Sequence, residues 1–263
     1  MNERISVRNI SKEFGKGSGR VEVLDGINVQ VGRHHFVSLL GPSGCGKSTL
    51  FNIISGLFEP TDGEALVDGS PDRLGTCGYM QQKDLLMPWK RITDNVALGL
   101  MVKGTSRREA RARAEEILER FGLGGFGHCY PSEISGGMRQ RAALARTFLA
   151  GDDVLLLDEP FGALDSLTRL QMQSWLLDIW QASAASILFI THDVDEAIRL
   201  SDRVYVLSER PASVVLTLEI DLPRPRPYET VLSPEFAALK AQAIRYLHPD
   251  TQDMSAKEMT SDA

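Results

Sequence analysis

The stretch that decides the fold is Gly41-Pro42-Ser43-Gly44-Cys45-Gly46-Lys47-Ser48-Thr49. A short apolar run, residues 36–40, comes directly before it, and residues 50–54 continue in apolar side chains after it. This order predicts a strand, a glycine-rich turn and a helix. The spacing G-x-x-x-x-G-K-[ST] is typical of a phosphate-binding loop of the Walker A kind.

The residue types in this loop suit the binding of phosphate. Gly41, Gly44 and Gly46 allow the backbone to curl so that successive N–H groups face phosphate oxygens. The helix that begins near Lys47 adds the positive end of its dipole. Lys47 would reach the β- and γ-phosphates, and the Ser48 hydroxyl would hold Mg²⁺. A glycine-rich turn that matches by chance is the alternative, and the strand before it and the helix after it favour the phosphate site.

Composition narrows the class of protein. The chain has 263 residues, of which 43% are hydrophobic and 24% charged, so one large or two small globular domains are expected. The net charge of −6 argues against a nucleic-acid-binding protein. The three cysteines are widely spaced and suit a reducing compartment. We expect no signal peptide and no membrane span, so a membrane role would need a partner.

The N-terminal region alternates apolar and polar residues. Ile5, Val7 and Ile10 favour one strand, and the alternation resumes between Val21 and Val31. Asp25-Gly26 interrupts it and predicts a hairpin turn there. The expected result is an antiparallel β-layer ahead of the phosphate loop. Phe14 could stack on a purine ring or could be an ordinary core or edge aromatic residue.

An apolar loop is expected after a short strand that ends at Gln81-Gln82. It reads Leu85-Leu86-Met87-Pro88-Trp89. Exposed apolar side chains in a loop suggest a contact surface. Folding of the loop onto its own core is the alternative.

Helices are expected from Ile92 to Lys103 and from Arg107 to Phe121. Ser106 and Glu109 have the spacing of a capping box. One stripe of the second helix is apolar at helical spacing: Ala110, Ala114, Ile117, Leu118 and Phe121. A mostly helical insert is therefore predicted over about residues 91–148.

Ser135-Gly136-Gly137 begins a further predicted helix. Backbone N–H groups at this helix start could bind a second anion. On these three residues alone, an ordinary capped helix start is the favoured interpretation.

Two continuous apolar runs predict buried parallel strands. Residues 154–157 lead into Asp158-Glu159, and residues 186–190 lead into Thr191-His192. Ligands of open α/β sheets lie at the carboxyl ends of the strands. One of the adjacent carboxylates could serve Mg²⁺ while the other polarises water. Solvated turn acids and a structural histidine are the alternatives.

The C-terminal part contains late strands at residues 204–207 and 214–216. Pro223-Arg224-Pro225-Arg226-Pro227 is expected to be extended, and Ser233-Pro234 to begin a helix that ends near Leu247. Disorder is expected from Pro249 onward. We predict one ATP-binding domain over residues 1–220 and an extension over residues 221–263.

Taken together and in this order, these motifs resemble the ATP-binding subunit of an ABC transporter. The resemblance covers about residues 4–218 and implies an α/β fold: a phosphate-loop (RecA-like) mixed sheet with an antiparallel β-subdomain and a helical subdomain. It also implies ATP and Mg²⁺ as cofactors.

The resemblance assigns roles position by position. Phe14 matches the aromatic residue that stacks on adenine, and Gln82 the glutamine that senses Mg²⁺, the γ-phosphate and the membrane partner. Residues 134–138, Ile-Ser-Gly-Gly-Met, match the signature LSGGQ with two departures, and Ser135 and Gly137 remain able to bind the γ-phosphate. The remaining matches are the Walker B acid, the catalytic glutamate, the D-loop acid and the switch histidine, namely Asp158, Glu159, Asp165 and His192.

Two stretches resemble the nitrate/sulfonate/taurine type of importer ATPase. They are residues 82–89 and the segment Glu209-Arg210-Pro211-Ala212 followed by Leu222-Pro223-Arg224-Pro225-Arg226. That group imports small anions or vitamin precursors together with a transmembrane permease and an extracytoplasmic solute-binding protein. The resemblance therefore implies a peripheral protein on the cytoplasmic face of the plasma membrane.

The resemblance further implies a head-to-tail homodimer, in which ATP lies between the phosphate loop of one copy and residues 135–137 of the other. A soluble ABC-type ATPase acting on ribosomes or DNA is one rival, although the expected second nucleotide domain or coiled-coil insert is missing. A phosphate-loop nucleotide kinase is another, and it leaves residues 135–137 unexplained. Cys45, close to Lys47 and a helix start, is expected to be a reactive thiol that ATP protects.

Overall fold

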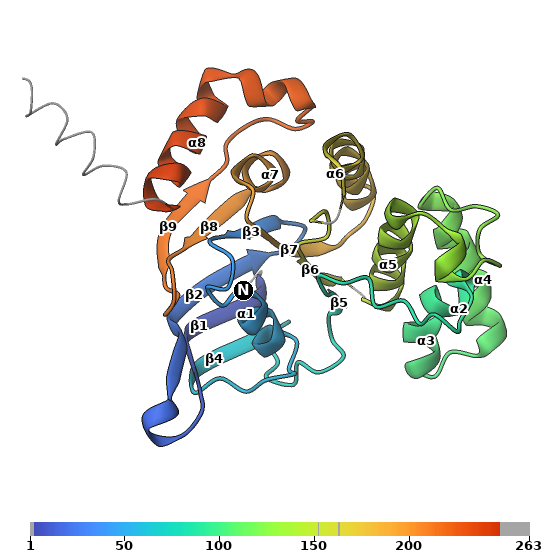
Figure 1. The fold of residues 1–263 in the computed structure, drawn as a ribbon, viewed down its shortest axis with the longest axis horizontal. Coiled ribbons are helices and arrows are strands. Elements are labelled where there is room, and N and C mark those ends of the chain that lie inside the picture. The colour runs from blue at the N-terminus through green and yellow to red at the C-terminus, as the bar shows by residue number, and fades with distance from the viewer. Residues whose placement is uncertain (1–2, 152, 163, 248–263) are drawn as a thin grey trace, which may run out of the picture.

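The computed structural model describes residues 3–151, 153–162 and 164–247. Two sheets and a group of helices make up the molecule (Figure 1). The strands are β1 Glu3–Phe14, β2 Val21–Gly32, β3 Phe36–Leu40, β4 Asp62–Val67, β5 Gly78–Met80, β6 Val154–Asp158, β7 Ser186–Thr191, β8 Arg203–Leu207 and β9 Val214–Glu219. The α-helices are α1 Lys47–Ile54, α2 Ile92–Val96, α3 Leu98–Val102, α4 Arg107–Arg120, α5 Gly136–Ala150, α6 Ser166–Gln181, α7 Val194–Leu200 and α8 Pro234–Leu247.

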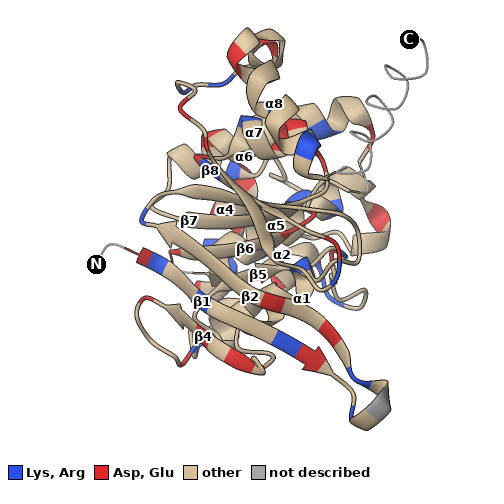
Figure 2. Cartoon of the chain, turned by 90° about the vertical axis from the view of Figure 1, so that its left-hand side faces the viewer, with Lys and Arg blue, Asp and Glu red and all other residues tan. Residues whose placement is uncertain are grey.

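The six-stranded sheet has the order β5-β6-β7-β3-β8-β9. Neighbouring strands from β5 to β8 are parallel, and β9 pairs antiparallel with β8 at the edge. Every residue of β3, β6 and β7 is buried, as their continuous apolar sequences predict. The β7 ribbon accordingly carries no charged residue (Figure 2). Because these strands are parallel, the loops after β3, β6 and β7 all leave the sheet at the carboxyl ends of the strands.

The antiparallel sheet has the order β2-β1-β4. The predicted hairpin turn at Asp25-Gly26 is wrong, because β2 runs through both residues and the chain turns earlier, between Phe14 and Val21. Gly26, at a φ of 59°, instead lies at an irregularity of the β1–β2 ladder, where Ser11 Oγ accepts its N–H at 3.0 Å. Glycine therefore marks a bulge in a continuous strand here.

Helices α2 to α5 form a group beside the six-stranded sheet (Figure 1). The predicted helix from Ile92 to Lys103 is divided at Ala97 into α2 and α3. In α4 the buried residues are Ala110, Ala114 and Leu118, which keep the predicted apolar stripe. The Ser106 hydroxyl accepts the Glu109 N–H at 3.3 Å, as its position at the start of α4 predicts. These helices share one hydrophobic cluster with side chains from the sheet.

The segment after β9 packs back on the sheet. Arg226 is buried and donates to the carbonyls of Ile198, Ile220 and Leu222. Helix α8 begins at Pro234 as predicted, and its Phe236 is 1% exposed in a cluster with α7, β8 and β9. The predicted disorder from Pro249 onward lies outside the described residues.

Candidate functional site

The phosphate loop leaves the carboxyl end of β3 and enters α1 at Lys47. Gly46 has a φ of 129°, and a Cβ on it would lie 2.8 Å from Leu24 Cδ2 and 3.0 Å from Val23 Cγ1. Any other residue would therefore clash with β2 as well as strain the backbone. Strand β2 thus limits the shape of the loop from behind.

Lys47 is folded onto the loop. Its side chain is buried, and Nζ donates to the carbonyl oxygens of Gly41 at 2.8 Å and Pro42 at 2.9 Å. The neighbouring Ser48 hydroxyl hydrogen-bonds to the Asp158 carboxylate at the end of β6. Burial raises the pKa of Asp158, while that hydrogen bond and the positive charge of Lys47 oppose the rise.

A cavity of about 360 Å³ opens beside these residues. Its lining brings together half of the residues predicted for the site, although they come from distant parts of the chain. They are Ser43, Gly44, Gly46, Lys47, Ser48, Thr49, Gln82, Asp158 and Glu159, joined by Arg210. The structure thus places Gln82, Asp158 and Glu159 around the same cavity as the phosphate loop.

Glu159 connects this cavity to the loop that follows β7. Its Oε2 lies 3.2 Å from Gln82 Nε2 and 3.4 Å from His192 Nδ1. The Glu159 backbone has a φ of 45°, in the left-handed region that non-glycine residues seldom adopt, and its N–H donates to the Ile190 carbonyl at 3.1 Å. Backbone conformations of this kind cost about 1–3 kcal/mol and cluster at functional sites. Here the turn aims the carboxylate between the glutamine and the histidine.

Ser135, Gly136 and Gly137 lie away from the phosphate-loop cavity. With Asp165 they line a second cavity of about 620 Å³. The Ser135 hydroxyl accepts the Met138 N–H at 3.3 Å and caps α5, and Asp165 accepts the Thr168 N–H at 3.0 Å and caps α6. The hydrogen bond from the Thr168 N–H lowers the pKa of Asp165. Within one chain, the predicted site is therefore divided between two surfaces.

Phe14 lies at the end of β1 and is 39% exposed. Its ring makes an edge contact with Phe58 at a centroid distance of 5.9 Å, and Lys12 Nζ lies 5.1 Å from its centroid. An exposed aromatic face beside a cation is compatible with the predicted stacking on a purine, although Phe14 lines neither cavity.

Two side chains are more buried than the sequence suggested. Cys45 is 2% exposed and packs in the hydrophobic cluster of α1 and β2, so its thiol is shielded from the solvent that a reactive thiol needs. Leu86 is 7% exposed and belongs to the helical core, whereas its neighbours Leu85 and Trp89 are 51% and 73% exposed. Leu86 is therefore buried, whereas Leu85 and Trp89 face solvent.

Three residues of the site were missed in the sequence. Arg210 donates to the Gly44 carbonyl at 2.7 Å. Arg169 donates to the Leu164 carbonyl at 3.2 Å and lies 3.9 Å from the Glu196 carboxylate. Glu196 in turn accepts from the Thr191 hydroxyl, next to His192, at 2.7 Å. The one sequence signal was the position of Glu196 four residues after His192.

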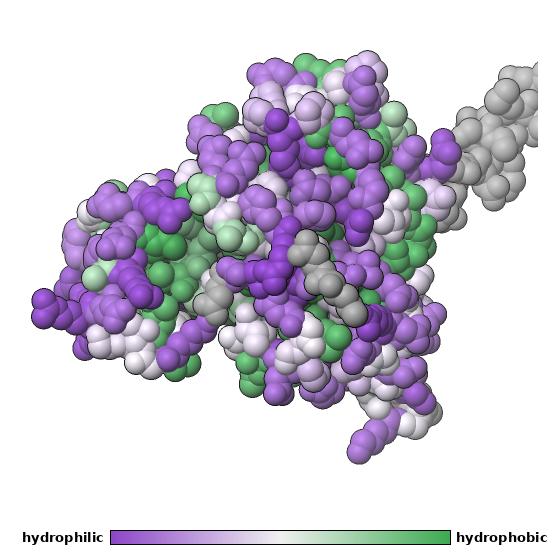
Figure 3. Space-filling view, turned by 180° about the vertical axis from the view of Figure 1, so that it is seen from behind, coloured by the Kyte–Doolittle hydropathy of each residue, from purple (hydrophilic) through white to green (hydrophobic). Residues whose placement is uncertain are grey.

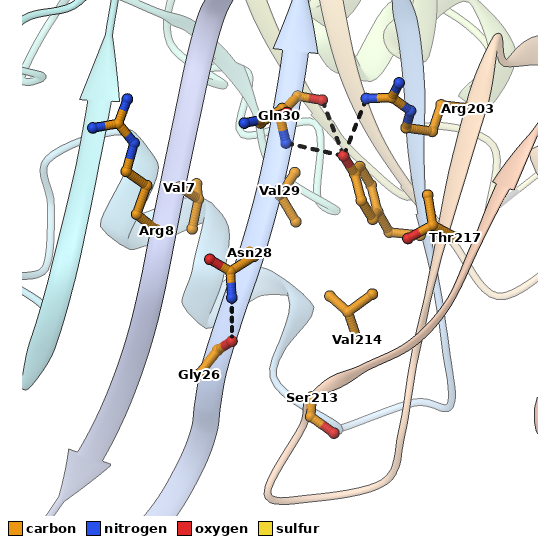
Figure 4. A pocket seen from close by; sticks show the side chains of 11 residues that line it. Val7, Arg8, Gly26, Asn28, Val29, Gln30, Arg203, Ser213, Val214 and Thr217 are labelled. Atoms are coloured by element: carbon orange, nitrogen blue, oxygen red, sulfur yellow. Dashed lines mark hydrogen bonds between the residues drawn. The ribbon is translucent and has the colours of Figure 1, made fainter.

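Another hollow, of about 510 Å³, lies between β1–β2 and β8–β9 (Figure 4). The Tyr205 hydroxyl accepts the Gln30 N–H at 3.2 Å and Arg203 Nη1 at 3.3 Å, and Asn28 Nδ2 donates to the Gly26 carbonyl at 2.8 Å. Gln30, Tyr205 and Arg203 thus link β2 of the antiparallel sheet to β8 of the six-stranded sheet. The hollow is therefore a junction between the two sheets.

Comparison with known proteins gives a consistent result. A family model described as ABC transporter matches residues 24–162. The taurine import ATP-binding protein TauB of Rhizobium johnstonii is 44% identical, over 95% of this chain and 98% of that protein. The aliphatic sulfonates import ATP-binding protein SsuB of Bacillus cereus is 43% identical, over 84% of this chain and 88% of that protein. A solved dimeric ATP-binding cassette in a post-hydrolysis state with ADP and Pi is 30% identical, with a TM-score of 0.73, over 83% of this chain and 100% of that chain.

The fold and the glycine-rich loop define a phosphate-loop nucleotide-binding protein. The matched segment and the long, strongly similar relatives go further: the chain belongs to the ABC transporter ATP-binding family. It is an ATP-binding protein and an ATPase. The predicted α/β fold is confirmed, and so is the family that the motifs resemble.

Proposed function

We propose that this chain is the ATP-hydrolysing subunit of an importer for small sulfonates or related anions. The observation that carries the proposal is the position of the Glu159 carboxylate, between Gln82 and His192 and beside the Lys47 loop. The relatives named for taurine and aliphatic sulfonates support the class of cargo. The rival soluble ATPase that acts on ribosomes or DNA is not favoured by them.

ATP would bind with its phosphates on the loop of residues 41–49. Backbone N–H groups and Lys47 would hold the β- and γ-phosphates, so Lys47 must exchange its carbonyl partners for phosphate oxygens. Phe14 would stack on the adenine ring, as its exposed face allows.

The residues beside the loop suit Mg²⁺. Ser48, Asp158 and Gln82 offer a hydroxyl, a buried carboxylate and an amide oxygen, the ligand types that Mg²⁺ takes together with substrate phosphates. No cluster of three or more histidine, cysteine or acidic side chains arranged for a metal occurs among the described residues. Phosphate oxygens would therefore supply the remaining ligands. When bound, Mg²⁺ would neutralise negative charge on the β- and γ-phosphates.

Glu159 would act as the general base. Its carboxylate would accept a proton from the attacking water while the water oxygen bonds to the γ-phosphorus and the bond to the β–γ bridging oxygen breaks. His192 would contact the γ-phosphate, and its 53% exposed side chain leaves it free to turn toward that group. The hydrogen bond from Gln82 would keep the carboxylate in place until water enters.

A second copy of the chain would complete the site. The two cavities on one chain share no lining residue, and residues 135–137 present an α-helix N-terminus that could bind an anion from elsewhere. A head-to-tail pair would place this helix start against the γ-phosphate bound by the partner. The dimeric form of the solved cassette supports this arrangement.

The loop of residues 85–89 would bind the permease. Met87 N–H donates to Asn95 Oδ1 at 2.7 Å, and Arg146 Nη1 donates to the Leu85 carbonyl at 2.8 Å, so the loop moves with the helical group. Apolar side chains gather where this group meets the rest of the molecule (Figure 3). Within the loop itself, the side chains of Leu85 and Trp89 are exposed. Gln82 comes shortly before this loop in the chain and donates to the Glu159 carboxylate. A movement of the loop caused by the permease would therefore reach Glu159.

No described helix is both long and apolar enough to cross a membrane. We propose that the chain lies on the cytoplasmic face of the plasma membrane, held there by its permease, with a solute-binding protein delivering cargo on the other side. The names of the two import proteins support this placement.

The test is a pull-down of tagged protein from detergent-solubilised membranes of the source cell. The variant Leu85→Asp/Trp89→Asp should lose a polytopic membrane protein that the wild type retains. Leu57→Asp/Leu232→Asp is the matched control, since these leucines are 51% and 81% exposed and lie outside the loop. Retention of ribosomes or DNA in place of a membrane protein would contradict the transport assignment.

A further inference from the structure

Arg210 brings a positive charge to the phosphate loop from a distant part of the chain. It lies between β8 and β9, and its Nη2 donates to the Gly44 carbonyl at 2.7 Å. It also lines the cavity that holds Lys47, Asp158 and Glu159. The established activity of the family assigns no task to this contact.

The β8–β9 connection is held in place by backbone hydrogen bonds to β2. The Asp25 N–H donates to the Ala212 carbonyl at 2.9 Å, and the Ala212 N–H donates to the Val23 carbonyl at 2.9 Å. Val23 is also one of the residues that a Cβ at Gly46 would meet. Strand β2 therefore supports both the phosphate loop and the segment that delivers Arg210.

The charge of Arg210 is free to act on a ligand. Its guanidinium bonds to a neutral carbonyl, and among the described residues no carboxylate forms an ion pair with it. The other charged side chains that line the cavity are Lys47, Asp158 and Glu159. With Arg210 the two cations balance the two acids, and without it the cavity would carry a net negative charge toward an anionic polyphosphate.

We propose that Arg210 is an affinity-determining residue for ATP: it fixes the Gly44 turn and supplies the second positive charge at the polyphosphate. It is a positioning residue and takes no part in proton or phosphoryl transfer. The inference rests on the proposed nucleotide site at residues 41–49.

The experiment measures displacement of a fluorescent nucleotide by ATP and by adenosine, for wild type and Arg210→Ala, Arg210→Gln and Arg210→Lys. We expect Arg210→Ala to weaken ATP about tenfold, the size of one charge-assisted hydrogen bond, with adenosine unchanged. Lysine should restore ATP affinity to within about threefold because it keeps the charge. Glutamine should not, and the loss should shrink at high salt because the charge lies in an open cavity. At saturating ATP, kcat should stay within about twofold.

Arg108→Ala is the control, since Arg108 is an exposed arginine on α4 outside the cavity. Equal ATP affinity for wild type and Arg210→Ala would overturn the proposal, and so would full rescue by Arg210→Gln, which restores a hydrogen bond without the charge. Lys47→Ala distinguishes a failure of the proposed nucleotide site from a failure of the inference about Arg210. If it binds ATP normally, the nucleotide site itself is wrongly placed; if it fails while Arg210→Ala binds normally, only the inference about Arg210 fails.

Discussion

At the scale of single residues, Glu159 concentrates the chemistry of the site. Its left-handed backbone, its hydrogen bond from Gln82 and its contact with His192 all act on one carboxylate. The adjacent Asp158 is buried and bonded to Ser48 instead. Successive residues at a strand end thus face different partners, which allows one acid to serve a metal and the other to serve water.

Replacing Glu159 with glutamine should separate binding from hydrolysis. The side chain keeps its size, but an amide cannot accept the proton of the attacking water. We expect steady-state hydrolysis to fall by about 10²–10⁴-fold, with ATP affinity unchanged. Glu229→Gln, which alters an exposed acid outside both cavities, should retain full activity. Hydrolysis by Glu159→Gln above about a tenth of wild type would count against the general-base role.

Sequence periodicity predicted some residues well and others poorly. The apolar runs before Asp158 and His192 placed both at strand ends, because a fully buried parallel strand has a continuous apolar sequence. The burial of Leu86 and Cys45 depends on packing against helices and strands elsewhere, which local pattern does not contain. The contact of Arg210 with Gly44 joins residues 166 positions apart. It depends on the packing of the β8–β9 connection against β2, which the sequence pattern does not show.

At the scale of elements, a buried polar network connects β7, α6 and α7. Glu196 on α7 accepts from the Thr191 hydroxyl at 2.7 Å and from Gln173 Nε2 at 2.9 Å, and Arg199 donates to Gln173 Oε1 at 2.9 Å. Thr191 precedes His192 in the chain. The network therefore fixes the direction in which the loop after β7 leaves the sheet.

Glu196 should make stability fall with rising pH relative to a variant that cannot titrate. Burial is the largest cause that raises its pKa, the charge of Asp193 adds to it, and Arg169 opposes it. The folded state therefore binds this proton more tightly than the unfolded state, and the resulting stability is present below the ordinary glutamate pKa and lost above it. The free energy of unfolding of Glu196→Gln, relative to that of wild type, should therefore rise when the pH is raised from 4 to 7.5.

Urea unfolding of both proteins at the two pH values measures this difference. Groups distant from Glu196 titrate equally in wild type and variant, so their contributions cancel in the comparison. The Thr191 hydroxyl can accept from the new amide as readily as it donated to the carboxylate, which keeps the network bonded. If the stability of wild type relative to Glu196→Gln instead rises with pH, the folded protein binds the Glu196 proton more weakly than the unfolded chain, and the prediction is contradicted.

At the scale of the whole molecule, the division of the site between two surfaces is the central feature. The phosphate-loop cavity holds the groups that would bind and hydrolyse ATP, and residues 135–137 lie on the other cavity with Asp165. The proposed second copy would bring the two together. ATP would then hold the dimer, and loss of the γ-phosphate would release it.

Light scattering during size-exclusion chromatography of Glu159→Gln, with and without Mg²⁺ and ATP, tests this most directly. The slow variant should run as a monomer without nucleotide and as a dimer with it. Adding Gly137→Asp should abolish the dimer, because the new carboxylate would face the γ-phosphate. The fold should tolerate this substitution, since a Cβ at position 137 would meet nothing closer than Thr168 Cγ2 at 3.5 Å. A Glu159→Gln protein that stays monomeric at saturating ATP, or that dimerises equally well with Asp at position 137, would contradict the account.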